Sequence, residues 1–299
     1  MSSIEPHQFY CLPWRVLPGA IPEDSEIFVI GDVHGQADLL AQALQSICDT
    51  PKQAATRKLV FLGDLIDRGP SSFKSIDLAM RGAEMANADE LNILPGNHDL
   101  MLLDALDDEA HAELWLVNGG KTVLAELGLN IETNSWTEIR EALFQALNQE
   151  YLHLMKSGPS HLRLGDLLLV QAGIHPHVDM SEFLSLDRQA VGAEDHWSTI
   201  RYPFLDWEGG WDANDPDPDR QARRPTVVVH GHTLSLRSDL RTAEDLQICD
   251  CIDTYRSIAL DIGAAYRPQL AWAHFRTGDV GAEVQVHAVV RELAFELMR

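Results

Sequence analysis

The sequence predicts an α/β fold in which parallel strands alternate with helices. Short apolar runs recur along the chain, each bounded by Gly, Asp or Pro, as expected of strands buried on both faces. Helix-length segments separate the first three runs, and polar side chains follow several runs directly. The six runs cover residues 27–30, 59–62, 91–94, 167–170, 227–229 and 258–260.

The segments between the first three runs predict crossover helices. Residues 37–48 and 73–86 carry apolar residues at helical spacing, so the first three strands are expected to form βαβ units. Residues 100–156 predict several further helices, with Asn118-Gly119-Gly120 as a break. We expect this stretch to form a helical cap beside the sheet.

The second half of the chain contains two polar stretches. Residues 209–224 are rich in Asp and Pro and lack apolar periodicity, which predicts a surface loop. Residues 235–254 predict an excursion or the edge of a small subdomain. Residues 270–275 and 284–290 are expected to close the fold as strands.

Composition and charge narrow the class of protein. The 299 residues are 45% hydrophobic and 23% charged, which suits one large folded core. The net charge of −23 repels nucleic acid and anionic lipid, so neither is expected as a partner. The sequence shows no targeting segment and no apolar run of spanning length, and its four cysteines suit reduced thiols. We therefore expect a cytoplasmic protein.

Potential metal ligands follow the predicted strands at their carboxyl ends, where open α/β sheets bind ligands. Asp32 and His34 come after the first run, Asp64 after the second, and Asn97 after the third. His232 follows a later run in the same way. Oxygen and imidazole donors together suit manganese, iron or zinc, whereas the histidines exclude an all-oxygen calcium site.

The motifs GDVHG, GDLIDRGP, GNHD and GHT, in this order, resemble those of the calcineurin-like metallophosphoesterases. The resemblance is to the phosphoprotein phosphatase branch, and LPGNHDLMLL, WLVNGGKTVL, TIRYPFL and ALDIGAAY are similar to its bacterial serine/threonine members. It implies a central β-sandwich flanked by helices (αββα), with a helical cap. It also implies a single domain over residues 27–276, with residues 1–26 and 277–299 packing on it or extending it.

The resemblance implies two divalent metal ions, with manganese as the first expectation and iron or zinc as alternatives. Asp32, His34 and Asp64 would bind the first ion, with Asp64 bridging to the second. Asn97 and His232 would bind the second ion, and Asn97 would also contact the substrate phosphate. In this family pattern the pair would lower the pKa of a shared water, which would supply the nucleophile for in-line attack on phosphorus.

The resemblance also assigns the remaining catalytic roles. His98 would protonate the leaving group, with Asp67 orienting its ring and favouring the protonated imidazole. Arg68 and Arg201 would bind the phosphoryl oxygens, because a guanidinium can contact two of them at once.

The sequence departs from the family pattern at Gln171. The family places a histidine there as a ligand of the second metal, and an amide oxygen binds such ions more weakly than imidazole does. Three outcomes are open: Gln171 itself contacts the metal, His175 reaches the site from four residues downstream, or the second metal is labile.

These observations leave three functions open. The first is a serine/threonine protein phosphatase, which could also accept phosphotyrosine. The second is a symmetrical dinucleoside tetraphosphate hydrolase, although that group usually lacks the equivalent of Asp67. The third is a metal-impaired module that binds phosphate or a protein partner. The expected partner is a phosphoprotein or a phosphorylated small molecule, and the sequence leaves the oligomeric state open.

Overall fold

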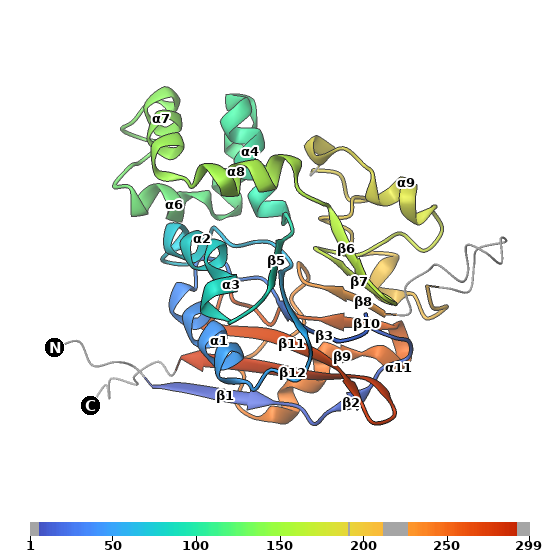
Figure 1. The fold of residues 1–299 in the computed structure, drawn as a ribbon. Helices are drawn as coiled ribbons and strands as arrows, with labels where there is room; N and C mark the ends of the chain where they lie inside the picture. The colour runs from blue at the N-terminus through green and yellow to red at the C-terminus, as the bar shows by residue number, and fades with distance from the viewer. Residues whose placement is uncertain (1–5, 191, 212–226, 292–299) are drawn as a thin grey trace.

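The protein is described by a computed structural model that covers residues 6–190, 192–211 and 227–291. Two β-sheets pack face to face, helices cover their outer faces, and a group of helices stands at one end (Figure 1). The predicted α/β sandwich with a helical cap is confirmed. The domain limits at residues 27 and 276 remain a prediction.

The first sheet combines a parallel half, which ends at the edge strand β5, with an antiparallel half. Its strand order is β1-β12-β11-β3-β4-β5, and β2 also pairs with β12. The β3, β4 and β5 strands are parallel, as predicted for βαβ units, while β11, β12 and β1 add antiparallel neighbours. The strands are β1 (His7–Cys11), β2 (Arg15–Val16), β3 (Ser25–Ile30), β4 (Thr56–Phe61), β5 (Glu90–Ile93), β11 (Gln269–Gly278) and β12 (Gly281–Arg291).

The second sheet has the order β6-β7-β8-β10-β9. Its central strands β7, β8 and β10 are parallel, and β6 and β9 are antiparallel edges. The strands are β6 (His161–Leu164), β7 (Leu167–Val170), β8 (Val227–His230), β9 (Asp250–Cys251) and β10 (Ser257–Ala259). The edge strand β9 belongs to the polar stretch 235–254, which therefore lies at a sheet edge.

The alternation of side chains along β3 shows why both faces of this strand are apolar. Ile27 and Val29 join the core between the two sheets, whereas Phe28 and Ile30 join the core under the helices. All four are buried. A strand covered on both sides reads as a continuous apolar run, which is the signal in the sequence.

Helices α1 (Ala37–Asp49), α2 (Ser72–Met80) and α3 (Gly82–Met85) lie beside the first sheet (Figure 1). The predicted helix 73–86 is two helices, because Arg81 between them leaves helical geometry with ψ near 9°. The second sheet is accompanied by α9 (Met180–Leu184), α11 (Ile252–Tyr255) and 3₁₀ helices at Arg188–Ala190, Phe204–Asp206 and Ala243–Cys249.

The helical cap is confirmed over the predicted stretch. Its elements are α4 (Asn97–Asp107), η1 (Glu109–His111), α5 (Ala112–Trp115), η2 (Leu116–Gly120), α6 (Lys121–Glu126), α7 (Trp136–Ala146) and α8 (Gln149–Ser157). The predicted break is present as a kink, at which Gly119 takes a φ of 131° that favours glycine. The cap stands above the sheets in Figure 1.

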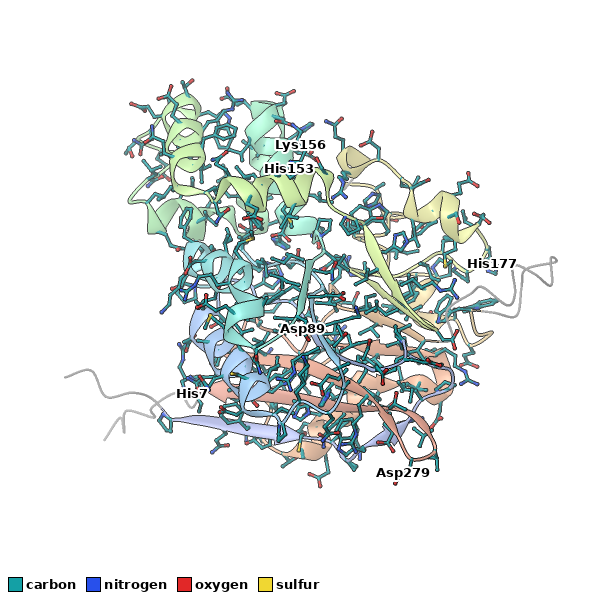
Figure 2. The ribbon with its side chains drawn as sticks, in the orientation of Figure 1. His7, Asp89, His153, Lys156, His177 and Asp279 are labelled. Atoms are coloured by element: carbon teal, nitrogen blue, oxygen red, sulfur yellow. The ribbon has the colours of Figure 1, made fainter. Side chains whose placement is uncertain are left out.

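The other segments predicted from the sequence are the closing strands and the polar loop. The closing strands are longer than predicted, and they form the β11–β12 hairpin with Asp279 at its turn (Figure 2). Most of the predicted loop 209–224 lies outside the described residues. Among the residues the structure describes, none of the helices combines the length and apolar character needed to cross a bilayer.

Candidate metal centre

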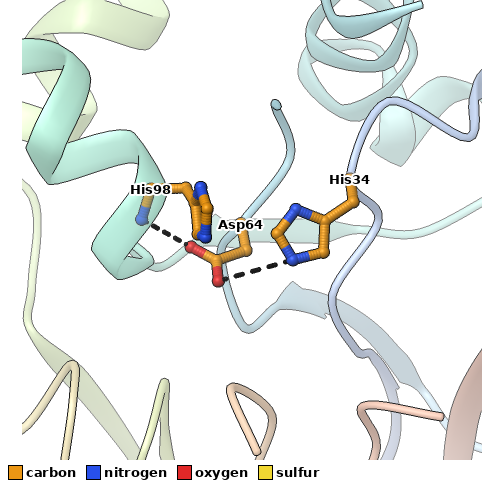
Figure 3. A group of neighbouring side chains, drawn as sticks. All are labelled: His34, Asp64 and His98. Carbon is orange, nitrogen blue, oxygen red and sulfur yellow. Dashed lines mark hydrogen bonds and ion pairs between the residues drawn. The ribbon is translucent and has the colours of Figure 1, made fainter. Parts of the chain in front are cut away.

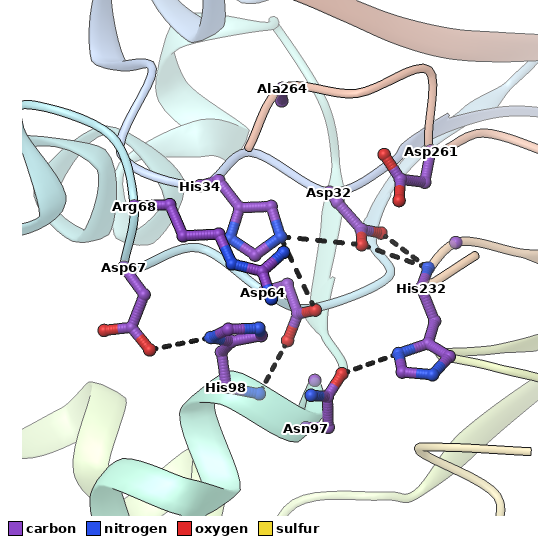
Figure 4. Close-up of polar contacts among 12 residues, drawn as sticks. Asp32, His34, Asp64, Asp67, Arg68, Asn97, His98, His232, Asp261 and Ala264 are labelled. Atoms are coloured by element: carbon purple, nitrogen blue, oxygen red, sulfur yellow. Dashed lines mark hydrogen bonds and ion pairs between the residues drawn. The ribbon is translucent and has the colours of Figure 1, made fainter. Parts of the chain in front are cut away.

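Six parallel strands from the two sheets end at one place. The ends of β3, β4 and β5 come from the first sheet, and those of β7, β8 and β10 come from the second. Figure 4 shows the side chains that gather there from both sheets. In strand order the residues that follow are Asp32, Asp64, Asn97, Gln171, His232 and Asp261.

Asp32, His34 and Asp64 form the first group of potential ligands. His34 Nε2 lies 4.0 Å from Asp32 Oδ2 and 3.9 Å from Asp64 Oδ2. Its other ring nitrogen, Nδ1, is 3.0 Å from the carbonyl oxygen of Ile66. A carbonyl only accepts, so Nδ1 carries the proton and the Nε2 lone pair faces the two carboxylates. This is the tautomer that a metal ligand requires.

Asn97, His232 and Gln171 form the second group. His232 Nε2 lies 3.1 Å from the Thr199 carbonyl oxygen, which again fixes the proton on that nitrogen. The other nitrogen, Nδ1, lies 2.8 Å from Asn97 Oδ1. Gln171 Nε2 lies 3.0 Å from Asp64 Oδ2, so the second group meets the first at Asp64.

The backbone around these groups is held in sparsely populated conformations. His34, Asp64, Asp67, Arg68 and His232 all have φ between 45° and 70°. Such left-handed residues cost energy and cluster at functional sites, where the surrounding structure enforces them.

The glycines that precede two ligands leave room for carboxylates. A Cβ atom on Gly231 would overlap Oδ1 of Asp32, and one on Gly96 would overlap Oδ1 of Asp64. The backbone N–H of His232 instead donates to the Asp32 carboxylate at 3.0 Å. The Gly-His and Gly-Asn pairs in the sequence therefore follow from close approach of backbone to carboxylate.

His98 and Asp67 form a buried pair beside the metal ligands. His98 Nδ1 lies 2.7 Å from Asp67 Oδ2, and Trp115 Nε1 donates to the other carboxylate oxygen at 3.0 Å. His34, Asp64 and His98 each place one potential ligand atom within 4.8 Å of the others (Figure 3). Burial lowers the pKa of His98 and raises the pKa of Asp67, so protein alone favours the neutral imidazole. The protonated imidazole expected from the sequence stays a prediction for the site with its substrate bound.

Asp99 is a site residue that the sequence did not suggest. Its Oδ2 accepts the backbone N–H of Asp64 at 2.8 Å and that of Gly96 at 2.9 Å. Its Oδ1 accepts the Tyr151 hydroxyl at 2.5 Å, which ties helix α8 of the cap to the metal centre. Burial raises the pKa of Asp99 to about 6, and these hydrogen bonds oppose that rise.

Arg68 and Arg201 line the cleft above the metal centre, which has a volume of about 790 Å³. Arg68 Nε donates to the Asn118 carbonyl oxygen at 3.1 Å, and the guanidinium lies over the Tyr266 ring. Its terminal amino groups make no hydrogen bond within the described residues. Arg201 is exposed in the same cleft, so both predicted arginines face the space where a phosphate would lie.

The pKa shifts of the buried side chains in the metal centre favour a bound cation. Burial raises the pKa of Asp32, with Asp261 adding repulsion, and burial also raises the pKa of Asp64. Burial lowers the pKa of His34 and His232, which keeps both imidazoles neutral. Buried carboxylates beside neutral imidazoles are the donor set of a divalent cation.

Acceptor atoms without donors also favour a bound metal. With the His232 tautomer fixed, the Nδ1 lone pair faces Asn97 Oδ1 at 2.8 Å, so a cation would satisfy both acceptors. The Oε1 atom of Gln171 is buried without a hydrogen-bond partner. The residues present therefore fit a pair of divalent cations.

His175, the predicted alternative to Gln171, lies elsewhere. Its Nδ1 accepts the His177 backbone N–H at 3.2 Å, and its ring lies near Phe183. Figure 2 shows His177 at the outer edge of the molecule. No contact joins His175 to the predicted ligands within the described residues. The strand end that holds Gln171 reaches the metal centre, and the loop beyond it turns away.

This combination of a two-sheet sandwich and a carboxylate, amide and imidazole cluster at its edge defines a metal-dependent phosphoesterase. The chain belongs to the calcineurin-like phosphoesterases, whose family model matches residues 25–236. Family membership supports hydrolysis of phosphate esters and dependence on two metal ions.

Similarity to individual proteins divides between two kinds of substrate. Serine/threonine-protein phosphatase 1 of Salmonella typhimurium is 37% identical over 94 residues, which is 31% of this chain and only 38% of that protein. The asymmetrical bis(5'-nucleosyl)-tetraphosphatase PrpE of Anoxybacillus flavithermus is 28% identical over 214 residues, 69% of this chain and 77% of that protein. A cold-active protein-tyrosine phosphatase of a Shewanella species shares the fold, with a TM-score of 0.51 and 18% identity over 91% of this chain and 86% of that one.

Proposed function

We propose that this protein hydrolyses phosphate monoesters with two divalent cations held at the metal centre. The observation that carries the proposal is the meeting of both ligand groups at Asp64, whose Oδ2 lies within 4 Å of His34 and 3.0 Å from Gln171. When bound, the cations would supply positive charge to the phosphoryl oxygens and lower the pKa of the attacking water. The proposed ligands are Asp32, His34 and Asp64 for one cation, and Asp64, Asn97, His232 and Gln171 for the other.

Arg68 and Arg201 would bind the phosphoryl oxygens from the cleft side. The guanidinium of Arg68 is held by Asn118 and Tyr266, so its free edge is already oriented. Asn97 begins helix α4, and its side chain would contact both the second cation and the substrate. These three side chains would place the phosphorus atom in front of the nucleophile.

His98 would donate a proton to the leaving oxygen through Nε2. The hydrogen bond from Nδ1 to Asp67 fixes the ring, and Trp115 fixes the carboxylate in turn. Burial lowers the pKa of His98, and the negative charge of a bound phosphate beside the ring would raise it, so substrate binding would favour the acid form.

The proposal is tested with aryl phosphates in manganese. His98→Ala should reduce turnover of phenyl phosphate by roughly 10²- to 10⁴-fold, and it should reduce turnover of nitrophenyl phosphate far less, because that leaving group needs no proton. The control is His153→Ala, which changes an exposed histidine on helix α8 (Figure 2). An equal loss of turnover for both substrates would contradict the acid role of His98. The absence of turnover by the wild-type protein would contradict the proposed function.

The leading substrate is a phosphoserine or phosphothreonine side chain in a protein, with phosphotyrosine as an extension. The GDLIDRGP motif with Asp67 and the similarity to a bacterial serine/threonine phosphatase support this choice. Manganese as the native ion and a cytoplasmic location remain predictions from the sequence. So does the exclusion of nucleic acid and membrane as partners.

A dinucleoside polyphosphate is the second candidate substrate, favoured by further side chains that line the cleft. Arg237 and Arg267 line it together with Tyr266, whose side chain is 66% exposed and available for stacking. Arg267 is oriented by Asp239, with Nε 3.1 Å from Oδ1. The sequence suggested a symmetrical hydrolase, whereas the relative that covers 69% of the chain is an asymmetrical one.

Product analysis separates the two substrates. Arg237→Ala should raise the KM for diadenosine tetraphosphate several-fold and leave nitrophenyl phosphate unchanged if the second candidate is correct. Arg81→Ala, at the exposed junction of α2 and α3, is the charge-matched control. Release of phosphate from phosphopeptides with no turnover of the dinucleotide would favour the protein phosphatase. The third function, a binding module, predicts one bound metal ion and no turnover of either substrate.

A further inference from the structure

Gln171 stands where the family has a histidine, and its side chain is completely buried. The amide nitrogen Nε2 donates to Asp64 Oδ2 at 3.0 Å and lies 3.5 Å from Asp32 Oδ2. One uncharged donor therefore faces two carboxylates of the first ligand group. The amide oxygen Oε1 is buried and has no hydrogen-bond partner.

The backbone on both sides of Gln171 is fixed. Its carbonyl oxygen accepts the Gly231 N–H at 2.8 Å, and the N–H of Ala172 donates to the Trp197 carbonyl oxygen at 3.0 Å. The terminal torsion of a glutamine side chain is soft and roughly two-fold. A half-turn of the amide therefore exchanges Nε2 and Oε1 without moving the backbone.

The two orientations suit two different conditions of the site. With Nε2 toward Asp64, the amide relieves repulsion between buried carboxylates and leaves its own oxygen unsatisfied, which costs free energy. With Oε1 in that position, two oxygens would lie about 3 Å apart, which is roughly the spacing of neighbouring oxygen ligands on a small divalent cation. While Asp64 is ionised, a cation between the two oxygens makes that orientation favourable.

We propose that Gln171 is a rotating amide that serves the site with and without the second cation. Its N–H group bridges the carboxylates when the cation is absent, and its oxygen binds the cation when it is present. This inference rests on the two-cation site of the proposed function. A family histidine would bind the second cation more strongly than the amide oxygen of Gln171 does. In return, the amide N–H group of Gln171 holds the carboxylates in place when the cation is absent.

Gln36 offers a matched control in the same chain. It is also a buried glutamine whose Oε1 lacks a partner, but its Nε2 donates to the Ala264 backbone carbonyl at 2.9 Å. Gln171→Leu and Gln36→Leu therefore remove the same chemical groups from different surroundings. Both should lower the melting temperature of protein stripped of metal, by roughly 3–10 °C.

Manganese titration then separates the two variants. Gln36→Leu should bind two equivalents as wild type does, whereas Gln171→Leu should bind the second at least about tenfold more weakly. Wild-type affinity for the second manganese in Gln171→Leu would overturn the proposal. So would a melting temperature of stripped Gln171→Leu equal to that of wild type. Neither measurement uses turnover, so two bound ions without phosphate release would refute the proposed function alone.

Side-chain NMR tests the rotation in wild-type protein, in case the variants fold poorly. With ¹⁵N-labelled glutamine, the Gln171 NH₂ signals should be protected from solvent exchange in stripped protein. Zinc is diamagnetic, and its addition should shift these signals as the N–H group leaves the Asp64 carboxylate. Unchanged signals after both zinc sites fill would overturn the proposal.

Discussion

The hydroxyl of Tyr151 offers a direct test of whether the cap supports the metal centre. It donates to Asp99 Oδ1 at 2.5 Å, and the other oxygen of Asp99 holds the backbone of Gly96 and Asp64. Tyr151→Phe removes only this hydroxyl and leaves the packing of the ring unchanged. A buried carboxylate oxygen then loses its partner.

The expected loss follows from the type of bond. Hydrogen bonds to charged groups contribute about 1.5–3 kcal/mol, so the free energy of unfolding should fall by about that amount. At roughly 2–4 °C per kcal/mol, the melting temperature should fall by roughly 5 °C. Because Asp99 positions Asp64, manganese affinity should also fall, by about tenfold or somewhat less.

Urea unfolding and calorimetric titration with manganese measure the two effects. Tyr255→Phe is the control, because the Tyr255 hydroxyl makes no hydrogen bond within the described residues. A loss below about 0.5 kcal/mol, together with unchanged manganese affinity, would refute the idea that the cap supports the site through Asp99.

Three further predictions concern the site, the core and pH. Gly231→Ala should reduce manganese affinity at least about tenfold in a calorimetric titration, because its Cβ would overlap the Asp32 carboxylate; wild-type affinity would contradict this. Arg57→Met should lower the free energy of unfolding in urea by about 3–5 kcal/mol, because it leaves Glu26 buried without the Nε partner now 2.7 Å away. Burial lowers the pKa of His287 to about 4, below the ordinary value near 6.5. The neutral imidazole therefore adds its full contribution to the free energy of unfolding above pH 6.5, and this contribution is lost as pH falls toward 4. The loss approaches about 3 kcal/mol, and His287→Gln should flatten the urea-derived stability profile in that window.

The central strands could be predicted from the sequence because they are buried on both faces. The run 167–170 coincides with β7, and the run 27–30 lies within β3. The edge strands β1 and β6 carry half-exposed side chains, so their residues mix polar and apolar types without a continuous run. Edge pairing depends on partners far along the chain, which a local pattern does not contain.

Asp261 could have been found with the rule that located the other ligands. It follows the predicted strand 258–260, as Asp64 follows its own strand, and it lines the same cleft. Asp99 could have been found in the same way, because it ends the GNHD motif after the third strand. Its contact with Tyr151 could not, because Tyr151 lies 52 positions further along the chain and follows no predicted strand. The orientation of the Gln171 amide likewise depends on carboxylates brought in by two other strands.

The contribution of both sheets to one site has a consequence for assembly during folding. The ends of β3, β4 and β5 carry Asp32, Asp64 and Asn97, whereas β7 and β8 carry Gln171 and His232. A folding intermediate that had formed only one sheet would hold part of the ligand set and could not bind both ions. Metal uptake during refolding should therefore be a late event that reports the docking of the two sheets.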